Sequence, residues 1–339
     1  MTKIFVTGGA GYIGTHTVLT LLRAGFEVTV FDNLEFGSLE MLDKVEVLAG
    51  KEINFIKGDV RDYSEISEAL EGTYDCVIHF AAYKSVVESY SKPLSYFENN
   101  VGGSLNLIKA MKQKGVKNII FSSTAAVYGQ PEVLPVNEKA KIIPLSVYAK
   151  TKAMVETILE EEIREGINSI RLRYFNVAGA EPSGKIGEDP SCLGNLIPRL
   201  FACLIGKHNL KIYGNTFPTP DGYQIRDYIH VVDLAEAHVS AMQYLLNNPA
   251  NFGGTLAMNL GTGKGTSVME LLLEVEKVTS RKIAYEIIEA KPGEPVELYA
   301  NPSLAKELLN WQARSNYLGI VETAWNWYKT CPEFSRFKD

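Results

Sequence analysis

A strand that runs directly into three evenly spaced glycines is the feature that most restricts the fold of this chain. Lys3–Thr7 is a short apolar run, and Gly8–Gly14 follows it with glycine at every third position. Tyr12–Ala24 then carries apolar residues at helical spacing. Glycines between a strand and a helix permit a tight turn and a close approach of the backbone to a ligand. The sequence therefore opens with a predicted βαβ unit whose helix N-terminus faces an anionic group.

The alternation of strands and helices continues beyond this first unit. Further apolar runs predict buried strands at Glu27–Phe31, Ile53–Ile56, Cys76–Phe80, Asn118–Phe121 and Ser169–Arg173. Helical stretches separate them, which is typical of a parallel sheet with right-handed crossovers. We therefore expect an α/β fold with a Rossmann-type, doubly wound parallel sheet over residues 1–180, and this domain should bind the dinucleotide.

The pattern changes after about residue 180. Glu181–Asn195 is rich in Pro, Gly, Asp and Ser, which predicts a loop over a cleft. Short strands are expected at Lys211–Tyr213 and Met258–Leu260, and helices at Val232–Leu246, at Val268–Val278 and around Trp325–Tyr328. These elements predict a smaller, mixed α/β substrate-binding domain over residues 181–339, with the chain free to cross between the domains after residue 180.

Composition argues against several other classes of protein. The net charge of −6 argues against binding along a nucleic-acid backbone, and no apolar run reaches the length of a membrane-spanning helix. Cys76, Cys192, Cys203 and Cys331 show no CxxC spacing, so we expect reduced thiols. The histidines form no metal-ligand pattern, and the N-terminus lacks a secretory signal. The sequence thus predicts a metal-free, cytoplasmic protein that binds neither nucleic acid nor membranes.

The end of the second strand indicates which dinucleotide binds. Asp32 stands 18 residues after Gly14, where a carboxylate can accept hydrogen bonds from both ribose hydroxyls of an adenosine. The same carboxylate repels a 2′-phosphate, and residues 33–38 contain no Arg or Lys. We therefore predict NAD rather than NADP. Asp59 and Val60, at the end of the third strand, are expected to contact the adenine by the same geometry.

A phenol and an ammonium one helical turn apart form the candidate proton-transfer pair. Tyr148 and Lys152 occupy positions i and i+4 of a predicted helix, so they share a face. A tyrosine has a pKa near ~10, and lowering this pKa to about 7 takes roughly 4 kcal/mol. A nearby lysine and a cationic nicotinamide both favour the phenolate. Ser122–Thr124 ends a strand upstream, and a hydroxyl there can pass a proton between substrate and Tyr148.

Five segments together carry a resemblance to a known family. They are Thr7–Gly14, His79–Ala82, Ser122–Thr124, Tyr148-x-x-x-Lys152 and Arg226–His230. In this order and spacing they resemble the extended short-chain dehydrogenase/reductase family, and the resemblance covers essentially the whole chain. Within that family, the match is nearest to the members that interconvert UDP-hexoses.

The resemblance implies reversible, NAD-dependent C4 epimerisation of UDP-glucose and UDP-galactose through a 4-keto intermediate. Tyr148 would take the proton from the 4-hydroxyl, directly or through Thr124, while the C4 hydride moves to the nicotinamide. The ketose would turn over while its UDP stays anchored, and the hydride would return to the opposite face, so that NAD stays tightly bound and is recycled. Related dehydratases carry acidic residues where this chain has Ala125 and Ala126, which leaves epimerisation without dehydration.

The glycine loop, the strand ends and the resemblance together define the residues expected at the site. The catalytic residues expected are Tyr148, Lys152 and Thr124. Those expected at the cofactor are Gly8, Gly11, Tyr12, Ile13, Gly14, Asp32, Asn33, Asp59, Val60, Phe80, Ala81, Lys84, Asn99, Ser122, Tyr148, Lys152, Tyr174 and Phe175. Those expected at the substrate are Thr124, Tyr148, Asn176, Asn195, Leu196, Lys211, Ile212, Tyr213, Arg226, Tyr228, Val268, Lys291, Glu294 and Leu298.

Some of these positions depart from the family pattern. Thr124 stands where serine is frequent, but it keeps the hydroxyl. Lys291 stands where an arginine commonly clamps the diphosphate, and lysine supplies charge without the bidentate fork. Glu294 replaces the usual aspartate, and Val177 replaces a proline that often follows the preceding Arg-Tyr-Phe-Asn run. Leu298 occupies a position whose size governs entry of an N-acetyl group: tyrosine closes the pocket, a small residue opens it, and leucine is intermediate.

Alternatives to the leading function stay open from the sequence. The same machinery with a different pocket would epimerise UDP-N-acetylglucosamine, alone or beside UDP-glucose, or it would epimerise UDP-glucuronate. A non-catalytic, dinucleotide-sensing regulator could share the fold, although such proteins typically lose the tyrosine or the lysine. For assembly, the resemblance implies an isologous homodimer in which Leu94–Lys114 and Ser146–Glu165 pack against their symmetry mates as a four-helix bundle.

Overall fold

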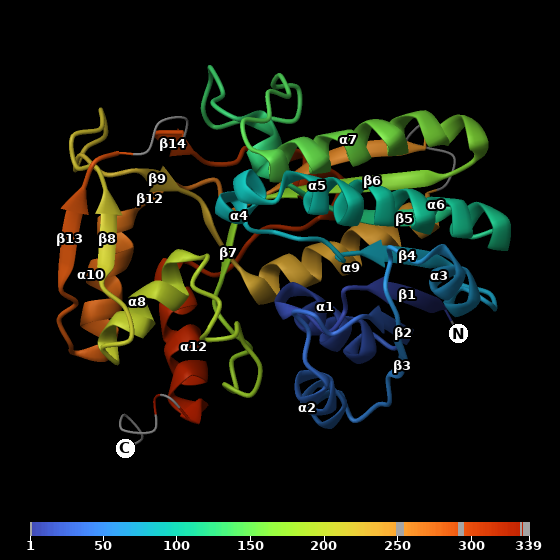
Figure 1. Ribbon diagram of the computed structural model, residues 1–339, viewed down its shortest axis with the longest axis horizontal. Coiled ribbons are helices and arrows are strands. Elements are labelled where there is room, and N and C mark those ends of the chain that lie inside the picture. The colour runs from blue at the N-terminus through green and yellow to red at the C-terminus, as the bar shows by residue number, and fades with distance from the viewer. Residues whose placement is uncertain (1, 249–253, 291–294, 333, 335–339) are drawn as a thin grey trace.

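A large parallel sheet forms the centre of the protein, as the computed structural model of residues 2–248, 254–290, 295–332 and 334 shows (Figure 1). Within these described residues its strand order is β11-β6-β5-β4-β1-β2-β3, and every neighbouring pair is parallel. The strands are β1 Lys3–Thr7, β2 Glu27–Asp32, β3 Asn54–Lys57, β4 Cys76–His79, β5 Asn118–Thr124, β6 Asn168–Tyr174 and β11 Thr255–Leu260. This order is that of a doubly wound Rossmann-type sheet, so the expected fold class is confirmed.

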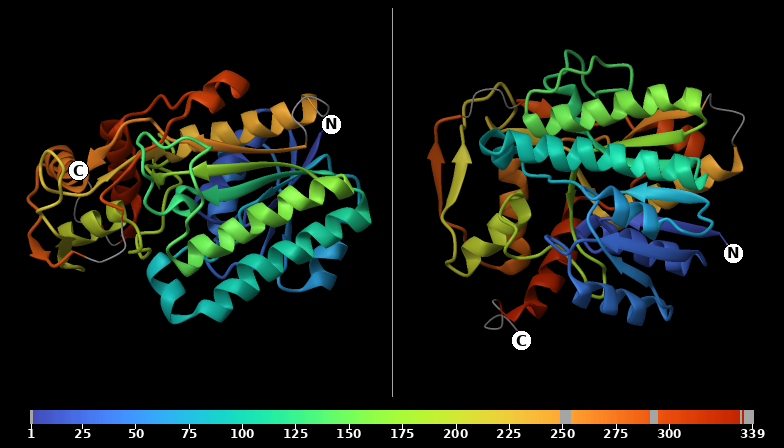
Figure 2. Two further views of the ribbon diagram at one scale, coloured as in Figure 1. Left: turned by 90° about the horizontal axis from the view of Figure 1, so that it is seen from above. Right: turned by 45° about the vertical axis from the view of Figure 1, so that its right-hand side comes forward.

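Helices cover both faces of this sheet (Figure 2), which explains why β1 and β4 are mostly continuous apolar runs rather than alternating ones. On one face lie α1 Tyr12–Arg23, α2 Leu39–Ala49, α9 Val231–Asn247 and α11 Ser303–Leu309. On the other lie α3 Tyr63–Ala69, α6 Gly103–Lys114 and α7 Val147–Glu161. The central strands are accordingly buried on both sides, and β4 is buried at all its residues.

Smaller elements continue the chain beside the carboxyl ends of the large sheet (Figure 1). The short strands there are β7 Asn176–Ala178, β8 Leu210–Tyr213, β9 Ile225–Arg226, β10 Tyr228–His230, β12 Thr266–Ser267, β13 Tyr285–Ile288 and β14 Glu297–Leu298. The helices there are α8 Leu196–Leu204, α10 Val268–Thr279 and α12 Tyr317–Thr330. These helices enclose a hydrophobic core of their own, with Phe201 and Tyr328 stacked at its centre.

The sequence located most strands of the large sheet to within about three residues, but it misassigned some elements. β11 was expected in the smaller domain, yet it pairs with β6 in the large sheet. The expected continuous helix over Leu94–Lys114 is divided into α5 Pro93–Tyr96, a π-helical turn at Phe97–Gly102, and α6. Helices α2, α8 and α4 (Val86–Ser91) were not predicted. The division of domains at residue 180 stays a prediction.

The described residues contain neither a candidate membrane-spanning helix nor a candidate metal site. None of their helices combines the length and the apolar character needed to cross a membrane. No group of three or more His, Cys, Asp or Glu side chains among them is arranged to hold a metal ion. The four cysteines are free thiols.

Buried histidines predict a loss of stability in mild acid. Burial lowers the pKa of His16 and of His238 to about 4 and that of His79 to about 3, whereas an unfolded histidine has a pKa of about 6.5. Between these values the unfolded chain binds more protons than the folded one, so the free energy of unfolding falls as the pH falls from about 6.5 to 4.

His238 offers the cleanest test of this effect. Its ring lies 4.8 Å from the ring of Phe80, and its Nε2 has no hydrogen-bond partner among the described residues. Its Nδ1 donates to the Leu234 oxygen at 2.9 Å. Phenylalanine therefore keeps a ring in this site and removes the titrating group together with one hydrogen bond. Between pH 7 and 4, the free energy of unfolding of His238→Phe should fall by on the order of 2 kcal/mol less than that of the wild type, as measured by urea unfolding. His208→Phe, at a position that is only partly buried, is the control. Parallel pH dependence of His238→Phe and the wild type would contradict the assignment.

Candidate active site

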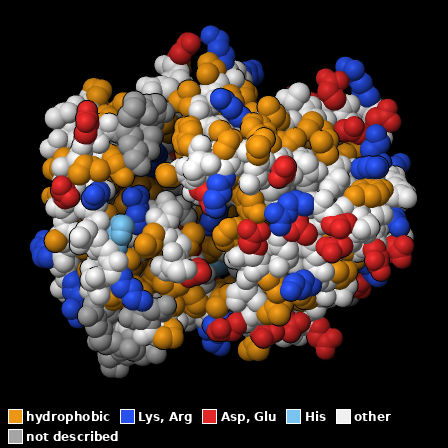
Figure 3. All heavy atoms as spheres, in the orientation of Figure 1, with side chains coloured by type: hydrophobic (Ala, Val, Ile, Leu, Met, Phe, Trp, Pro, Cys, Tyr) orange, Lys and Arg blue, Asp and Glu red, His pale blue; other side chains and the backbone are white. Residues whose placement is uncertain are grey.

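One large cavity lies at the carboxyl ends of the parallel strands, where the large sheet meets the smaller elements. Its volume is about 1700 Å³, and Figure 3 shows the molecule hollowed between its two parts. Sites for one drug-sized ligand are about 300–1,000 Å³, so this cavity has room for two ligands end to end. The crevice where β1 meets β4 is the point at which the strand order reverses, which is where open α/β sheets bind ligands.

The glycine loop forms a cradle that only glycine can build. Gly8 has φ +70°, and a Cβ on it would lie 2.6 Å from the Ala81 nitrogen. A Cβ on Gly14 would lie 2.3 Å from the Gly8 oxygen. At Gly11, the N-cap of α1, a Cβ would meet only the Gly8 oxygen, at 3.4 Å, so that its open side faces the cavity. This backbone surface, with the helix N-terminus beside it, fits the pyrophosphate of a dinucleotide.

Asp32 ends β2 with its carboxylate at the cavity wall. The carboxylate accepts hydrogen bonds from the backbone nitrogens of Ala10 (3.0 Å) and Leu34 (2.8 Å), which fix its orientation. Burial raises the pKa of Asp32, and these two hydrogen bonds oppose that effect. Asn33 and Val60 lie beside it in the cavity lining. The position and acceptor character of Asp32 fit a ribose diol, as the sequence predicted.

Tyr148 and Lys152 project from the first turns of α7 toward the cavity. Ser146 caps this helix by accepting from the Ala149 nitrogen, and the i, i+4 spacing then places both side chains on the face that lines the cavity. The Lys152 Nζ donates to the Ser122 oxygen at 2.8 Å and lies 4.8 Å from the centre of the Phe121 ring. Both side chains are therefore held at the carboxyl end of β5.

Burial sets the electrostatics of this pair in the protein alone. Burial raises the pKa of Tyr148 well above its ordinary value, and the hydrogen bond with Thr124 opposes that only in part. Burial also lowers the pKa of Lys152 to about 7, against the opposing effect of the Glu156 carboxylate. In the protein alone, desolvation therefore dominates the pKa of both groups. The expectation of a lowered phenol pKa relies on Lys152 together with a cationic nicotinamide, and it stays a prediction.

A buried ion pair between Glu156 and Arg173 holds α7 against the large sheet. Glu156, one turn after Lys152, accepts hydrogen bonds from the Arg173 side chain of β6 at 2.5–3.1 Å and a further one from the Ser123 hydroxyl. Arg173 also donates to the Tyr128 hydroxyl at 3.0 Å. These contacts tie α7 to β5 and β6, so they fix the height of Tyr148 over the sheet.

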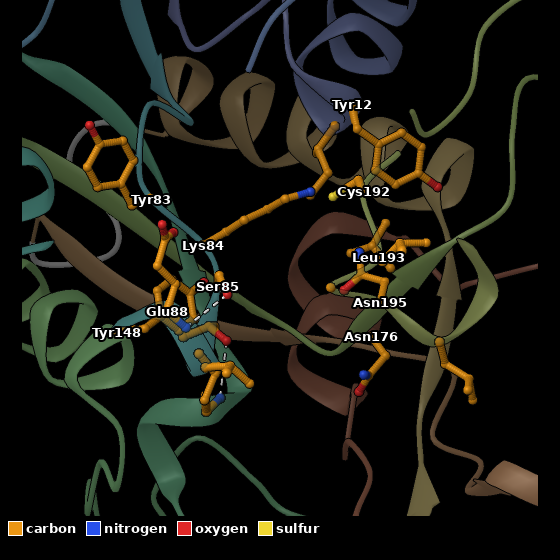
Figure 4. Close-up of a pocket in the computed structure, with 18 of the residues that line it drawn as sticks. Tyr12, Tyr83, Lys84, Ser85, Glu88, Tyr148, Asn176, Cys192, Leu193 and Asn195 are labelled. Carbon is orange, nitrogen blue, oxygen red and sulfur yellow. Dashed lines mark hydrogen bonds between the residues drawn. The ribbon is translucent and has the colours of Figure 1, made fainter. Parts of the chain in front are cut away.

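The second half of the cavity is lined from the smaller elements. Figure 4 shows Asn176 and Asn195 on its far wall, opposite Tyr148. Ala125 and Ala126, the positions that carry acids in dehydratases, line the cavity beside Thr124. The expected substrate residues that line it are Thr124, Tyr148, Asn176, Asn195, Leu196, Lys211, Ile212, Tyr213, Arg226, Tyr228, Val268 and Leu298.

Four expected site residues are not found at the cavity wall. Lys291 and Glu294 lie outside the described residues. Ser122 lies behind the wall, where its Oγ hydrogen-bonds the Tyr174 hydroxyl. Asp59 does not line the cavity either, because its carboxylate binds the Arg61 side chain. The other expected cofactor residues all line it.

Sequence reasoning missed a carboxylate that joins the two halves of the cavity. The buried Glu188 accepts a hydrogen bond from Asn195 Nδ2 at 2.6 Å, and its Oε1 lies 3.6 Å from Lys84 Nζ. Figure 4 shows Lys84 stretched across the cavity toward Tyr12 and Cys192. A single Glu in the loop before α8 carries no periodic signal. Lys84 itself was expected at the cofactor, but nothing in the sequence links it to Glu188.

Comparison with known proteins places the chain in a family. The model of the NAD dependent epimerase/dehydratase family matches residues 4–260. The UDP-glucose 4-epimerase of Yersinia enterocolitica is 45% identical over 336 residues, which cover 97% of this chain and 98% of that protein.

Solved structures agree with this match. That of UDP-glucose 4-epimerase from Bifidobacterium longum in complex with NAD+ and UDP has a TM-score of 0.92 and 39% identity, covering 98% of this chain and all of the other. That of the UDP-Glc/GlcNAc 4-epimerase from Campylobacter jejuni has a TM-score of 0.84 and 35% identity, with the same coverage. The resemblance seen in the sequence is confirmed, and the chain belongs to the NAD-dependent epimerase/dehydratase family.

Proposed function

We propose that this protein interconverts UDP-glucose and UDP-galactose by epimerisation at C4, with NAD as its tightly bound, recycled cofactor. The observation that carries the proposal is the position of Tyr148, Lys152 and Thr124 at the junction of the glycine-lined half of the cavity and the half lined by Asn176 and Asn195. A group that moves protons at this junction can act on a sugar held in one half beside a dinucleotide held in the other. Relatives at this identity are UDP-glucose 4-epimerases, which supports the same substrates here.

The chain's own residues divide the work between anchoring and proton transfer. Gly8, Gly11 and Gly14 cradle the cofactor pyrophosphate, and Asp32 holds the adenosine ribose. Asn176, Asn195 and Arg226 are among the anchors of UDP, while the other expected residues that line the cavity contact the two ligands. When bound, NAD would accept the hydride from C4 of the sugar and return it, and its oxidised form would supply positive charge that favours the phenolate of Tyr148.

Tyr148 acts as the base that removes the proton of the sugar 4-hydroxyl, with Thr124 as a relay between them. Because burial raises the pKa of Tyr148 in the protein alone, the positive charge of the oxidised cofactor is needed to favour the phenolate. The pKa of Lys152, at about 7, lets this residue hold or release a proton at neutral pH. Ala125 and Ala126 offer no acid to expel a hydroxyl, so the 4-ketose has only the return of hydride open to it.

The relay role of Thr124 predicts a difference between two replacements. Thr124→Ser keeps the hydroxyl, so kcat should stay within about threefold of the wild type. Thr124→Val keeps the shape but removes the hydroxyl that hydrogen-bonds Tyr148, and we expect kcat to fall about 10²-fold. Steady-state assays with UDP-galactose measure both. Equal activities of the two variants would contradict the relay.

The main alternative within this family is a UDP-N-acetylglucosamine 4-epimerase, possible also as a second activity. The side chain of Leu298 is buried in the cavity wall beside Phe175, and its size is intermediate between a closed and an open pocket. One structural relative is a UDP-Glc/GlcNAc 4-epimerase, which favours this alternative over UDP-glucuronate. Separate assays of the three sugar nucleotides distinguish these activities.

We also propose that the protein forms a homodimer through a four-helix bundle built from the α5–α6 and α7 segments. The segments carry exposed hydrophobic side chains, among them Leu94, Leu105 and Met154, and Figure 3 shows hydrophobic side chains gathered where α5 and α7 run in Figure 1. Two copies would bury these faces against each other. A monomer mass by light scattering at micromolar concentration would count against it. A cytoplasmic location and a place in galactose metabolism remain predictions.

The experiment that tests the proposed function is incubation of the purified protein with UDP-galactose without added NAD, followed by proton NMR. We expect UDP-glucose to form with no net production of NADH. If no conversion occurs even after NAD is added, the assignment fails, and the other UDP-sugars and the non-catalytic regulator become the candidates.

A further inference from the structure

A ring of polar contacts lies at the end of the cavity that Asp32 and Val60 line, and two of its members, Glu35 and Tyr83, line the cavity themselves. It consists of Glu35, Asp59, Arg61 and Tyr83, which we call the clasp. Arg61 donates to the Asp59 carboxylate at 2.9 and 2.5 Å and to the Tyr83 hydroxyl at 3.0 Å. The Tyr83 hydroxyl in turn donates to the Glu35 carboxylate at 3.0–3.1 Å. The Arg61 Nη2 also lies 3.6 Å from Glu35 Oε2, so the hydroxyl and a direct ion pair both join the guanidinium to this carboxylate.

The clasp connects loops that follow three different strands. Glu35 follows β2, Asp59 and Arg61 follow β3, and Tyr83 follows β4. In the sheet, β1 lies between β4 and β2, so the contact between Tyr83 and Glu35 spans the strand end that carries the glycine loop. Asn33 completes the ring, because its Nδ2 donates to Asp59 at 2.9 Å.

Tyr83 is a fixed support for this ring. Its backbone nitrogen donates to Asn100 Oδ1 at 2.8 Å, and its carbonyl accepts from Asn100 Nδ2 at 3.0 Å. Its ring lies 5.5 Å from that of Tyr96 and 5.9 Å from that of Phe36, the latter in edge contact. Glu35, Phe36 and Tyr83 all line the cavity, at the end that Asp32 and Val60 also line.

We propose that the clasp retains the cofactor: the three loops must separate for the adenosine end of NAD to leave, and the clasp holds them together. A recycled cofactor needs no exit during turnover, so a slow release costs the reaction nothing. The inference rests on the proposed function only in that NAD is recycled, and it concerns the rate of NAD release rather than the chemistry. The ion pairs are partly exposed, so their effect should weaken with salt.

The test measures NAD release directly, without any sugar nucleotide. NAD-loaded protein is diluted, free NAD is separated by ultrafiltration at intervals, and it is quantified by an enzymatic cycling assay. Tyr83→Phe removes both hydrogen bonds of the hydroxyl and keeps the ring, and Glu35→Gln removes the charge. We expect each variant to release NAD at least about fivefold faster than the wild type. The double variant should match the single ones, since they break the same ring.

Tyr63→Phe is the matched control, because its hydroxyl donates to Gln113 on the outer surface of α3 and α6, away from the cavity. Release of NAD from Tyr83→Phe within twofold of that from the wild type and from Tyr63→Phe would overturn the proposal. So would additive effects in the double variant. A protein that releases NAD slowly but converts no UDP-sugar would refute the proposed function and leave the clasp intact. If the protein epimerises UDP-galactose but the variants and the wild type release NAD at equal rates, the clasp proposal fails and the proposed function stands.

Discussion

Replacing Tyr148 with phenylalanine should lower kcat by about 10³-fold while the protein keeps its bound NAD. The ring remains in place on α7, so the shape of the cavity is preserved, but the group that exchanges a proton with the sugar is lost. Proton transfer by a positioned side chain contributes about 10²–10⁴-fold. Because the Tyr148 hydroxyl lies at the junction of the two halves of the cavity, no other described tyrosine is expected to replace it.

Steady-state epimerase assays and the NAD content of the purified variant together check this prediction. Tyr63→Phe, at a position on α3 that does not line the cavity, controls for loss of a tyrosine hydroxyl as such. A Tyr148→Phe variant that retains more than about a tenth of wild-type kcat would contradict the role of Tyr148. Loss of NAD from the same variant would mean that the hydroxyl serves binding rather than proton transfer.

The second large effect is expected at Gly11, where an added methyl group should lower NAD affinity and leave the stability of the protein nearly unchanged. A Cβ at this position meets only the Gly8 oxygen, at the ordinary contact distance of 3.4 Å, and its open side faces the cavity. We expect Gly11→Ala to lower NAD affinity by about 100-fold, or roughly 2.8 kcal/mol. The free energy of unfolding of NAD-free protein should change by less than about 1 kcal/mol.

Gly14→Ala and Gly319→Ala give the two limits for comparison. At Gly14 the Cβ would lie 2.3 Å from the Gly8 oxygen, so the loop itself must shift, and both stability and NAD affinity should fall. At Gly319 in α12 the nearest atoms are 3.9 Å away, so neither should fall. Isothermal titration with NAD and urea unfolding measure the two quantities. Unchanged NAD affinity in Gly11→Ala would show that the pyrophosphate does not lie on this loop.

The fold could be predicted where the determining interactions are local. Strands buried on both faces are mostly apolar, which is why the run that forms β4 is visible in the sequence. Which sheet a strand joins is a different question. The apolar residues of β11 would suit a buried strand in either domain, and only the pairing of β11 with β6 assigns it to the large sheet. That pairing depends on the whole topology.

The candidate site also has parts that could be predicted from the sequence and parts that could not. The loop Gly8–Gly14 and the pair Tyr148 and Lys152 were predicted because each is recognisable within a short segment. The glycines indicate the loop, and the helical spacing indicates the pair. The clasp and Glu188 were missed because the role of each depends on partners far away in the sequence, such as Tyr83 for Glu35 and Lys84 for Glu188. The spacing of Tyr148 and Lys152 also says nothing about desolvation, which raises the pKa of the phenol in the protein alone.

The most direct test of the central claim is the fate of the hydrogen at C4. UDP-galactose carrying deuterium at C4 is incubated with the purified protein without added NAD, and the UDP-glucose formed is examined by NMR. If the C4 hydride leaves and returns to the same sugar within one cavity, the deuterium is retained at C4 of the product. Deuterium lost to water, or exchanged between sugar molecules, would contradict C4 epimerisation with a retained cofactor.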